Sequence, residues 1–205
     1  MCEQQTPEHV IIVHHSEIAL KKGNRGFFEA RLRINIKKAL KDVPGVDVRV
    51  TYGRFVIYVP GAADMSLIVS RLKNVIGIAS FKVAHKGDPD PEILKEQVFD
   101  KVKDLQFDSF RVDTRRADKQ FPYKSVEVNQ IVGGRIHMAM GKRVDLKNAE
   151  FVVNIEIFNK QVFFAVEAHA GERGLPVGSA GKVVSLLSAG IDSPVSSFRM
   201  IKRGC

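Results

Sequence analysis

One stretch decides the fold near the C-terminus: Val183-Val184-Ser185-Leu186-Leu187-Ser188-Ala189-Gly190-Ile191-Asp192-Ser193-Pro194-Val195. Its apolar, β-favouring beginning predicts a strand, and its small residues predict a loop. A helix follows, with Ser193 as the candidate N-cap and Pro194 as its first residue. Unpaired backbone N–H groups at such a helix start, together with the helix dipole, favour a bound phosphate group. We therefore expect a phosphate-binding loop over residues 188–193.

The composition is that of a globular protein. The chain has 205 residues, enough for one or two domains, and 44% of them are hydrophobic and 27% charged. No apolar run approaches the ~20 residues of a membrane span, and residues 1–8 lack the apolar core of a secretory signal. Cys2 and Cys205 lie at the two ends and form no disulfide framework. We expect a cytoplasmic protein that does not bind a membrane.

The charge favours a polyanionic partner, because the formal net charge is +9. One short segment gathers much of it: Arg111, Arg115, Arg116, Lys119 and Lys124. Such a cluster would contact phosphates and give affinity with a steep salt dependence. Phe121 and Tyr123 interleave with these charges and could stack on an unpaired base, but we expect Phe121-Pro122 to pack into the domain instead.

The N-terminal part predicts a split βαβ sheet. Apolar residues recur every four positions at Phe28, Leu32, Ile36 and Leu40, which predicts a helix over about residues 24–41. Strands are expected at residues 10–13, 46–50, 55–59 and 76–83, and Asp64 is expected to cap a second helix. This order is that of a ferredoxin-like domain, which we place at residues 1–84.

A second unit is expected over residues 85–170, after a Gly/Pro-rich linker at residues 86–91. Its helices are predicted at residues 91–103, with Ile93 on the apolar face, and at residues 125–140, with Ser125 as the cap. A strand is expected at residues 109–114, and Asn159-Lys160 joins a hairpin of residues 151–158 and 161–167. Gly133-Gly134 costs about 1 kcal/mol per glycine in a helix and suggests close approach of a backbone or of RNA. Residues 171–181 form a second linker, and residues 182–205 begin a third domain.

Three segments resemble the tRNA 4-thiouridine synthetase family, also called the thiamine biosynthesis sulfurtransferase family. The first is Ser16-Glu17-Ile18-Ala19-Leu20-Lys21-Lys22-Gly23-Asn24-Arg25, which is similar to the family's N-terminal signature. The second is Thr114-Arg115-Arg116-Ala117-Asp118-Lys119-Gln120-Phe121-Pro122-Tyr123-Lys124-Ser125, similar to the core of the RNA-binding THUMP domain. The third is Gly174-Leu175-Pro176-Val177-Gly178, which leads into the loop at residues 188–193. That loop resembles the Ser-Gly-Gly-x-Asp-Ser signature of the PP-loop ATP pyrophosphatases.

The resemblance covers essentially the whole chain and implies its fold and activity. The fold class it implies is α+β: a ferredoxin-like domain, an α/β THUMP domain, and the first strand, loop and helix of an α/β PP-loop domain. The implied activity is ATP-dependent formation of 4-thiouridine at position 8 of tRNA. ATP with Mg²⁺ adenylates the uridine, and a persulfide charged by a cysteine desulfurase delivers the sulfur. The first two domains would hold the acceptor end of tRNA, and the same family supplies sulfur for the thiazole of thiamine.

The resemblance also assigns candidate site residues. Those for ATP and its pyrophosphate are Leu186, Leu187, Ser188, Ala189, Gly190, Asp192 and Ser193. Those for RNA are Arg25, Arg115, Arg116, Lys119 and Lys124. Ala189 stands where the family has a glycine, which would permit a positive φ or close approach to pyrophosphate. No catalytic residue and no metal site of the chain's own are expected, and Cys205 does not match the family's persulfide cysteine.

A single strand cannot build the nucleotide crevice of a doubly wound domain. We therefore expect these 205 residues to bind tRNA and to show no thiolation alone. The rest of the PP-loop domain could belong to a separate synthetase chain or to the partner protomer of a homodimer. The alternative is a stand-alone, non-catalytic THUMP protein that binds tRNA and keeps its phosphate loop as a remnant.

Overall fold

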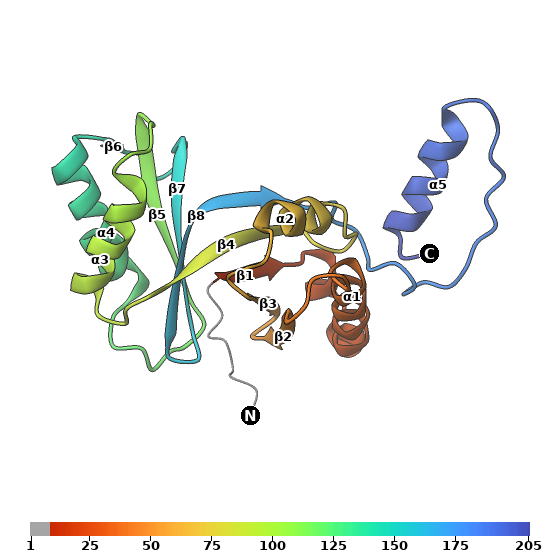
Figure 1. Cartoon of the computed structure of the whole chain (residues 1–205), viewed down its shortest axis with the longest axis horizontal. Helices are drawn as coiled ribbons and strands as arrows, with labels where there is room; N and C mark the ends of the chain where they lie inside the picture. The colour runs from red at the N-terminus through yellow and green to blue at the C-terminus, as the bar shows by residue number, and fades with distance from the viewer. Residues whose placement is uncertain (1–8) are drawn as a thin grey trace. The chain divides into compact units, whose positions relative to one another are not determined.

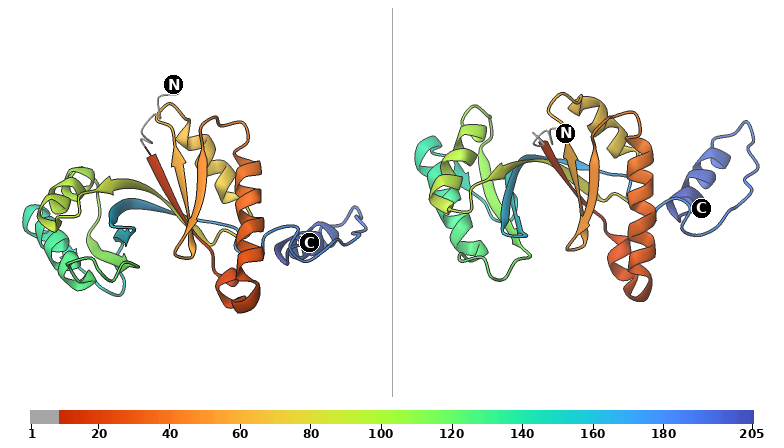
Figure 2. Two further views of the ribbon diagram at one scale, coloured as in Figure 1. Left: turned by 90° about the horizontal axis from the view of Figure 1, so that it is seen from below. Right: turned by 60° about the horizontal axis from the view of Figure 1, so that its bottom comes forward.

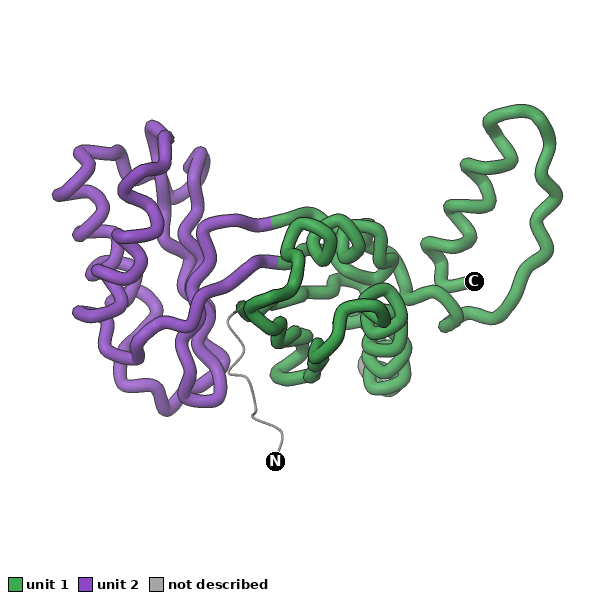
Figure 3. Tube along the Cα trace, in the orientation of Figure 1, with its two compact units in different colours: residues 1–81, 169–205 green, residues 82–168 purple. Residues whose placement is uncertain are grey.

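The computed structural model describes residues 9–205. They form two compact units: residues up to 81 together with 169–205, and residues 82–168 (Figure 3). Two strands, β4 (Ser80–Gly87) and β8 (Gln161–Ala170), begin in one unit and end in the other. The domain boundaries predicted from the sequence at residues 84, 170 and 181 stay predictions.

The first unit contains the split βαβ order that the sequence predicts. Its elements are β1 (His9–His14), α1 (Arg25–Ala39), β2 (Asp47–Thr51), β3 (Arg54–Val59), α2 (Met65–Lys73) and β4. Two 3₁₀ turns, η1 (Glu17–Leu20) and η2 (Lys22–Asn24), join β1 to α1. The strands are ordered β2-β3-β1-β4, with β3 antiparallel to both β1 and β2. The prediction of a ferredoxin-like sheet is confirmed.

The core of the first unit lies between this sheet and its two helices, which pack together on one side of it (Figure 2). Leu32 and Ile36 of α1 and Ile68 and Leu72 of α2 are fully buried, as the apolar periodicity requires. Asp64 caps α2, since its carboxylate accepts hydrogen bonds from the N–H groups of Ser66 (2.9 Å) and Leu67 (3.2 Å).

The last strand of this sheet is displaced from its predicted position. It begins at Ser80, whereas residues 76–83 were expected, because Gly77 adopts a φ of +108° and turns the chain. The expected linker at residues 86–91 is also shorter than predicted. Lys86 and Gly87 still belong to β4, and Asp90 already caps the next helix by accepting a hydrogen bond from Glu92 N–H at 2.9 Å.

The second unit contains α3 (Pro91–Val102), β5 (Ser109–Arg116), α4 (Ser125–Met140), β6 (Arg143–Val144), β7 (Phe151–Phe158) and most of β8. The strand order is β8-β7-β5-β6, in which β5 is parallel to β6 and β7 while β7 is antiparallel to β8. The β7–β8 hairpin turns at Asn159 and Lys160, both with positive φ (50° and 57°), as the sequence predicts.

The helices α3 and α4 lie side by side against one face of this sheet (Figure 1). The core between these helices and the sheet includes Leu94, Val98, Val132, Ile155 and Phe164. Ile93 was expected on this face but is 49% exposed, so that prediction is wrong. Ser125 is the first residue of α4 rather than its cap. The preceding Lys124 N–H donates to the Glu127 carboxylate at 2.6 Å.

One ion pair is buried inside the second unit. Lys82 of β4 and Glu156 of β7 are 6% and 1% exposed, and their Nζ and Oε1 atoms lie 3.2 Å apart. A charge removed from water is stabilised by a nearby opposite charge, so each residue of this pair stabilises the other.

Residues 171–181 form hydrogen bonds with earlier residues of the first unit along much of their length. Gly171 N–H donates to the Ala79 carbonyl (3.1 Å) and Arg173 N–H to the Ile78 carbonyl (2.7 Å). Further on, the Asn35 side-chain amide donates to the Val177 carbonyl at 3.1 Å.

The predicted strand at residues 183–187 is absent: these residues form no regular structure, and none of the strands within residues 9–205 pairs with them. A strand needs a neighbour for its backbone hydrogen bonds, which explains why the apolar run alone does not form one. The predicted loop and helix are present, and α5 spans Asp192–Lys202. Ser193 is its second residue, so the prediction of Ser193 as N-cap is wrong. None of the helices in residues 9–205 is long and apolar enough to cross a lipid bilayer.

Candidate nucleic-acid interface and nucleotide loop

The basic segment of the second unit begins at the end of β5 with Arg115 and Arg116. The Arg115 side chain is 57% exposed, and its Nη2 lies 3.5 Å from Asp113 Oδ2. An exposed ion pair of this kind is weak, so the guanidinium remains available to a stronger anion.

The next residue, Arg116, holds the loop that follows β5 in place through hydrogen bonds. Its Nη1 donates to the backbone carbonyls of Phe121 (3.0 Å) and Tyr123 (2.9 Å). A guanidinium has five N–H donors, so three remain for another acceptor. Arg111 is used in the same way, since it donates to the carbonyls of Leu146 (3.3 Å) and Lys147 (3.5 Å).

Lys119 and Lys124 are exposed on the loop that Arg116 braces. Neither makes an ion pair with another residue of the described part of the chain. Phe121 is buried in the core and Tyr123 packs against it, with ring centroids 6.1 Å apart. The expectation of packing into the domain is confirmed for Phe121, whereas Pro122 is exposed.

Lys160 adds a basic residue to this surface. The Asp118 carboxylate accepts hydrogen bonds from the N–H groups of Gln120 (3.0 Å) and Lys160 (3.2 Å), which brings the β7–β8 turn against the loop. Lys160, Asp118 and Gln120 line a pocket of about 330 Å³ with Pro89, Phe121 and Pro122. The sequence predicts the turn at Asn159-Lys160 but not its contact with Asp118, which lies 42 residues earlier.

Arg25 lies at the start of α1 in the first unit. Its Nε donates to Glu29 at 2.8 Å, one helical turn later, and its guanidinium covers Gly53 of the β2–β3 turn. Glu29 also lies 3.5 Å from Nε2 of His15, whose side chain is 2% exposed. Burial lowers the pKa of His15 below its ordinary value of 6.5, and the nearby Glu29 only partly opposes this effect. His15 is therefore neutral near pH 7.

The loop before α5 is closed by two serine side chains. Ser188 N–H donates to Ser193 Oγ at 2.9 Å, the two hydroxyls lie 3.1 Å apart, and Gly190 N–H donates to Ser188 Oγ at 3.3 Å. Asp192 begins the helix with an exposed side chain. The loop thus places hydroxyl groups and a carboxylate at the positive end of a helix dipole, an arrangement that suits a phosphate group and a cation bound to it.

Ala189 does not require the backbone freedom of glycine. Within residues 9–205, the non-glycine residues with positive φ are Tyr52, Asn159, Lys160 and Arg173, so Ala189 is not among them. Of the two reasons for a glycine at this position, only close approach of a ligand remains. Leu186 and Leu187, the other predicted contacts, are 88% and 72% exposed.

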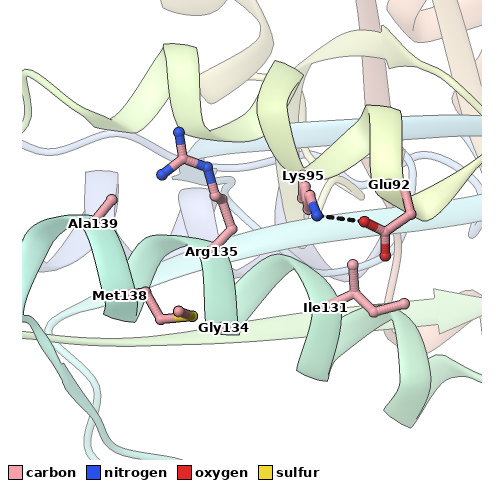
Figure 4. Close-up of a pocket in the computed structure, with 7 residues that line it drawn as sticks. All are labelled: Glu92, Lys95, Ile131, Gly134, Arg135, Met138 and Ala139. Atoms are coloured by element: carbon pink, nitrogen blue, oxygen red, sulfur yellow. Dashed lines mark hydrogen bonds and ion pairs between the residues drawn. The ribbon is translucent and has the colours of Figure 1, made fainter.

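A groove on the second unit runs between α3 and α4 (Figure 4). Gly134 lies on it, and a Cβ added there meets no atom within 4 Å. A Cβ at Gly133 would touch only the Val112 side chain, at 3.6 Å. Neither glycine is needed for a close backbone contact, so that part of the expectation is wrong. Arg135 crosses the groove and donates to Glu96 at 2.8 Å while stacking over Phe99.

The chain matches three family models in sequence order. The ThiI ferredoxin-like domain matches residues 10–82, the THUMP domain residues 91–167, and the thiamine biosynthesis protein (ThiI) residues 178–205. Among curated proteins, the "Probable tRNA sulfurtransferase" of Brevibacillus brevis is 42% identical over 198 residues, 95% of this chain and 49% of that protein. Its namesake in Caldanaerobacter subterraneus is 41% identical, over 95% of this chain and 51% of that protein. The chain spans about half the length of the curated relatives it matches.

Two solved structures share the fold over 96% of this chain. The crystal structure of a 4-thiouridine synthetase–RNA complex with bound ATP has a TM-score of 0.76 and 34% identity, and half of that chain is covered. The crystal structure of PH1313 from Pyrococcus horikoshii has a TM-score of 0.83 and 30% identity, with 66% of that chain covered.

Proposed function

Because the chain belongs to the ThiI family of tRNA sulfurtransferases, we propose that it is the tRNA-binding portion of an ATP-dependent enzyme that makes 4-thiouridine at tRNA position 8. One observation carries the proposal: the unit that matches the THUMP domain exposes Arg115 at the end of β5 and Lys119 and Lys124 on the loop that follows. Such cations bind the RNA backbone through phosphates and do not read bases. The related synthetase whose structure contains RNA supports this assignment.

ATP is the proposed co-substrate, and Ser188, Gly190, Asp192 and Ser193 are the residues that would hold its phosphates. Their hydroxyls, N–H groups and position at the start of α5 fit a pyrophosphate, and Asp192 would help to position Mg²⁺. Bound ATP would supply the activation of the uridine carbonyl oxygen. Leu186 and Leu187 would line the same site only when further chain covers them, because they are almost fully exposed.

Further partners complete the proposal. The acceptor end of tRNA would lie on the two N-terminal domains, and a cysteine desulfurase would supply persulfide sulfur. The rest of the synthetase domain would come from more of the same chain, from a separate chain or from a second protomer. Sulfur supply for thiamine thiazole synthesis belongs to the same proposal.

Titration of the protein with tRNA at two salt concentrations tests the RNA part. We expect the affinity to fall steeply as salt rises, because each neutralised phosphate releases condensed cations. An affinity that does not change with salt would contradict a binding surface made of Arg115, Lys119 and Lys124.

The stand-alone alternative is favoured by Ala189, since a methyl group stands where the family has glycine and would oppose close approach of a pyrophosphate. The intact mass of the protein in its native cell separates the two. A mass near 22.8 kDa would support a separate RNA-binding module or a split enzyme. A mass about twice as large would support an enzyme that carries its own adenylation domain.

A further inference from the structure

A basic pocket lies in the first unit, where residues 173–174, η1 and the last turn of α5 meet. Its volume is about 490 Å³, and it is lined by Glu17, Arg173, Gly174, Arg199, Lys202 and Arg203. Four of these side chains are cationic and one is anionic. No part of the site described above includes them.

Backbone hydrogen bonds hold the walls of this pocket in place. Leu175 N–H donates to the Lys202 carbonyl at 2.9 Å, and Ser179 N–H donates to the Gly204 carbonyl at 2.9 Å. Gly174 adopts a φ of +82°, and a Cβ there would lie 2.5 Å from the Lys202 carbonyl oxygen. The end of α5 is therefore fixed against residues 174–179, and the pocket does not depend on side chains alone.

Most of the positive charge in the pocket has no partner. Lys202 Nζ lies 3.4 Å from Glu172, a partly exposed pair. The guanidinium groups of Arg173, Arg199 and Arg203 are exposed and make no hydrogen bond or ion pair with any residue of the described segment 9–205. Like charges gathered in one pocket repel each other, and a bound anion relieves that repulsion.

Arg173 gives the independent indication of a ligand. Its φ of +57° is left-handed, a conformation that disfavours a long side chain and favours glycine. The conformation is imposed from both sides, because Arg173 N–H donates to the Ile78 carbonyl (2.7 Å) and its carbonyl accepts from Gly77 N–H (2.8 Å). A residue selected for the backbone alone would be glycine. Glycine would avoid this conformational cost, whereas arginine places a guanidinium group in the pocket.

Helix stabilisation explains only part of the cluster. Arg199, Lys202 and Arg203 lie at the C-terminal end of α5, where cations interact favourably with the helix dipole. Arg173 lies outside the helix, so the dipole does not account for it.

We propose that this pocket binds a phosphate group of the RNA backbone. Guanidinium groups bind phosphate oxygens through two parallel N–H donors, which matches the three unpaired arginines. The pocket is separate from the nucleotide loop, which lies at the opposite end of α5, about 15 Å away along the helix. The proposal rests on the proposed function and adds a second RNA contact in the first unit.

The decisive variant is Arg173→Gly, tested in the whole 205-residue protein. Glycine relieves the left-handed strain, so the melting temperature should stay the same or rise. The affinity for tRNA at low salt should fall about tenfold, and the slope of log affinity against log salt should decrease by about 1. Arg199→Ala should weaken tRNA binding in the same way. Lys101→Gln on α3 removes one exposed charge outside both basic clusters and should leave binding unchanged.

The outcomes separate this inference from the proposed function. Wild-type protein that does not bind tRNA at all would overturn the proposed function. If Arg173→Gly and Arg199→Ala bind tRNA as tightly as the wild type does, the proposed phosphate contact in the pocket is wrong and the proposed function stands. Inorganic phosphate and ATP are titrated alongside. If Arg173→Gly weakens the binding of ATP and leaves tRNA binding intact, the pocket is a nucleotide site and the RNA assignment is wrong.

Discussion

At the scale of single residues, Arg115 and Arg116 are neighbours with different tasks. Arg116 donates hydrogen bonds to the carbonyls of Phe121 and Tyr123, whereas the exposed Arg115 pairs with the half-buried Asp113. We predict that Arg115→Ala lowers tRNA affinity and reduces the salt slope by about 1 without changing stability. Arg116→Ala should also destabilise the protein, by about 1–3 kcal/mol, because two partly buried carbonyls lose a charged donor. Filter binding with tRNA and thermal melting of both variants test this. An equal decrease in melting temperature for the two variants would refute the assignment of a structural role to Arg116 alone.

His15 predicts a pH dependence of stability. The unfolded chain binds a proton on this residue near pH 6.5, while the folded protein binds it only at lower pH because burial lowers the pKa of His15. The free energy of unfolding should therefore be independent of His15 above pH 6.5. It should decrease as pH falls below that value, by about 1.4 kcal/mol per unit of pKa lowering, and then level off.

Comparison of the wild type with His15→Leu isolates this contribution from the other histidines. Urea unfolding between pH 5 and pH 8 should show a shallower pH dependence in the variant. A variant with the full wild-type slope would show that His15 is not responsible.

The sequence reveals which residue types are present but not which groups they bind. The basic segment is visible as a run, yet the bonds of Arg116 to Phe121 and Tyr123 depend on how the loop folds back. The basic pocket is invisible for the same reason: Arg173 and Arg199 are 26 positions apart and meet only through the packing of α5.

At the scale of elements, α4 contains a glycine with no structural requirement. A Cβ at Gly134 meets open space, so Gly134→Ala should raise the free energy of unfolding by about 0.5–1 kcal/mol through reduced backbone entropy. Gly141→Ala is the matched control on the same helix. Gly141 ends α4 with a φ of +65°, so alanine there should destabilise the protein.

The same Gly134→Ala variant tests whether RNA approaches this groove. Unchanged tRNA affinity in a more stable protein would exclude RNA contact at Gly134. Lower affinity in a more stable protein would confirm the sequence-based suggestion that the glycine makes room for RNA.

The buried Lys82–Glu156 pair links β4 to β7 across the intervening strand β8. Removal of one partner, as in Lys82→Met, should cost about 3–5 kcal/mol because Glu156 is left charged and buried. The double variant Lys82→Met/Glu156→Leu should recover most of that loss. Denaturant unfolding of Lys82→Met, Glu156→Leu and the double variant measures this coupling, and a double variant as unstable as the single ones would contradict it.

Most elements follow from the sequence because their apolar periodicity is local. The helices α1, α3 and α4 and the β7–β8 hairpin all form where the pattern predicts them. The strand expected at residues 183–187 does not form, because a strand needs a neighbouring strand and an apolar run does not reveal whether one is present. None of the strands within residues 9–205 pairs with these residues. Asp64 caps α2 as predicted, but the predicted caps Ser125 and Ser193 lie one and two residues after the actual N-caps. The Ser193 hydroxyl bonds back to Ser188 rather than into its own helix.

At the scale of the whole molecule, the candidate phosphate loop at residues 188–193 adjoins none of the strands within residues 9–205. The exposed apolar residues nearby include Val184, Leu186, Leu187 and Ile191. We predict that the 205-residue chain binds tRNA but does not thiolate it, because a doubly wound nucleotide site needs several strands. Mass spectrometry of tRNA nucleosides after incubation with ATP and a persulfide donor tests this. Appearance of 4-thiouridine at the rate of a full-length relative would refute it.

The division of the chain into units has a consequence for synthesis on the ribosome. The second unit is a continuous segment, residues 82–168, so it can fold as soon as it has left the exit tunnel. The first unit cannot complete its folding so early, because Gly77, Ile78 and Ala79 form backbone hydrogen bonds with Gly171 and Arg173. These two residues are synthesised about 90 positions later. Although its sheet is translated first, the N-terminal unit should be the last to complete its hydrogen bonds.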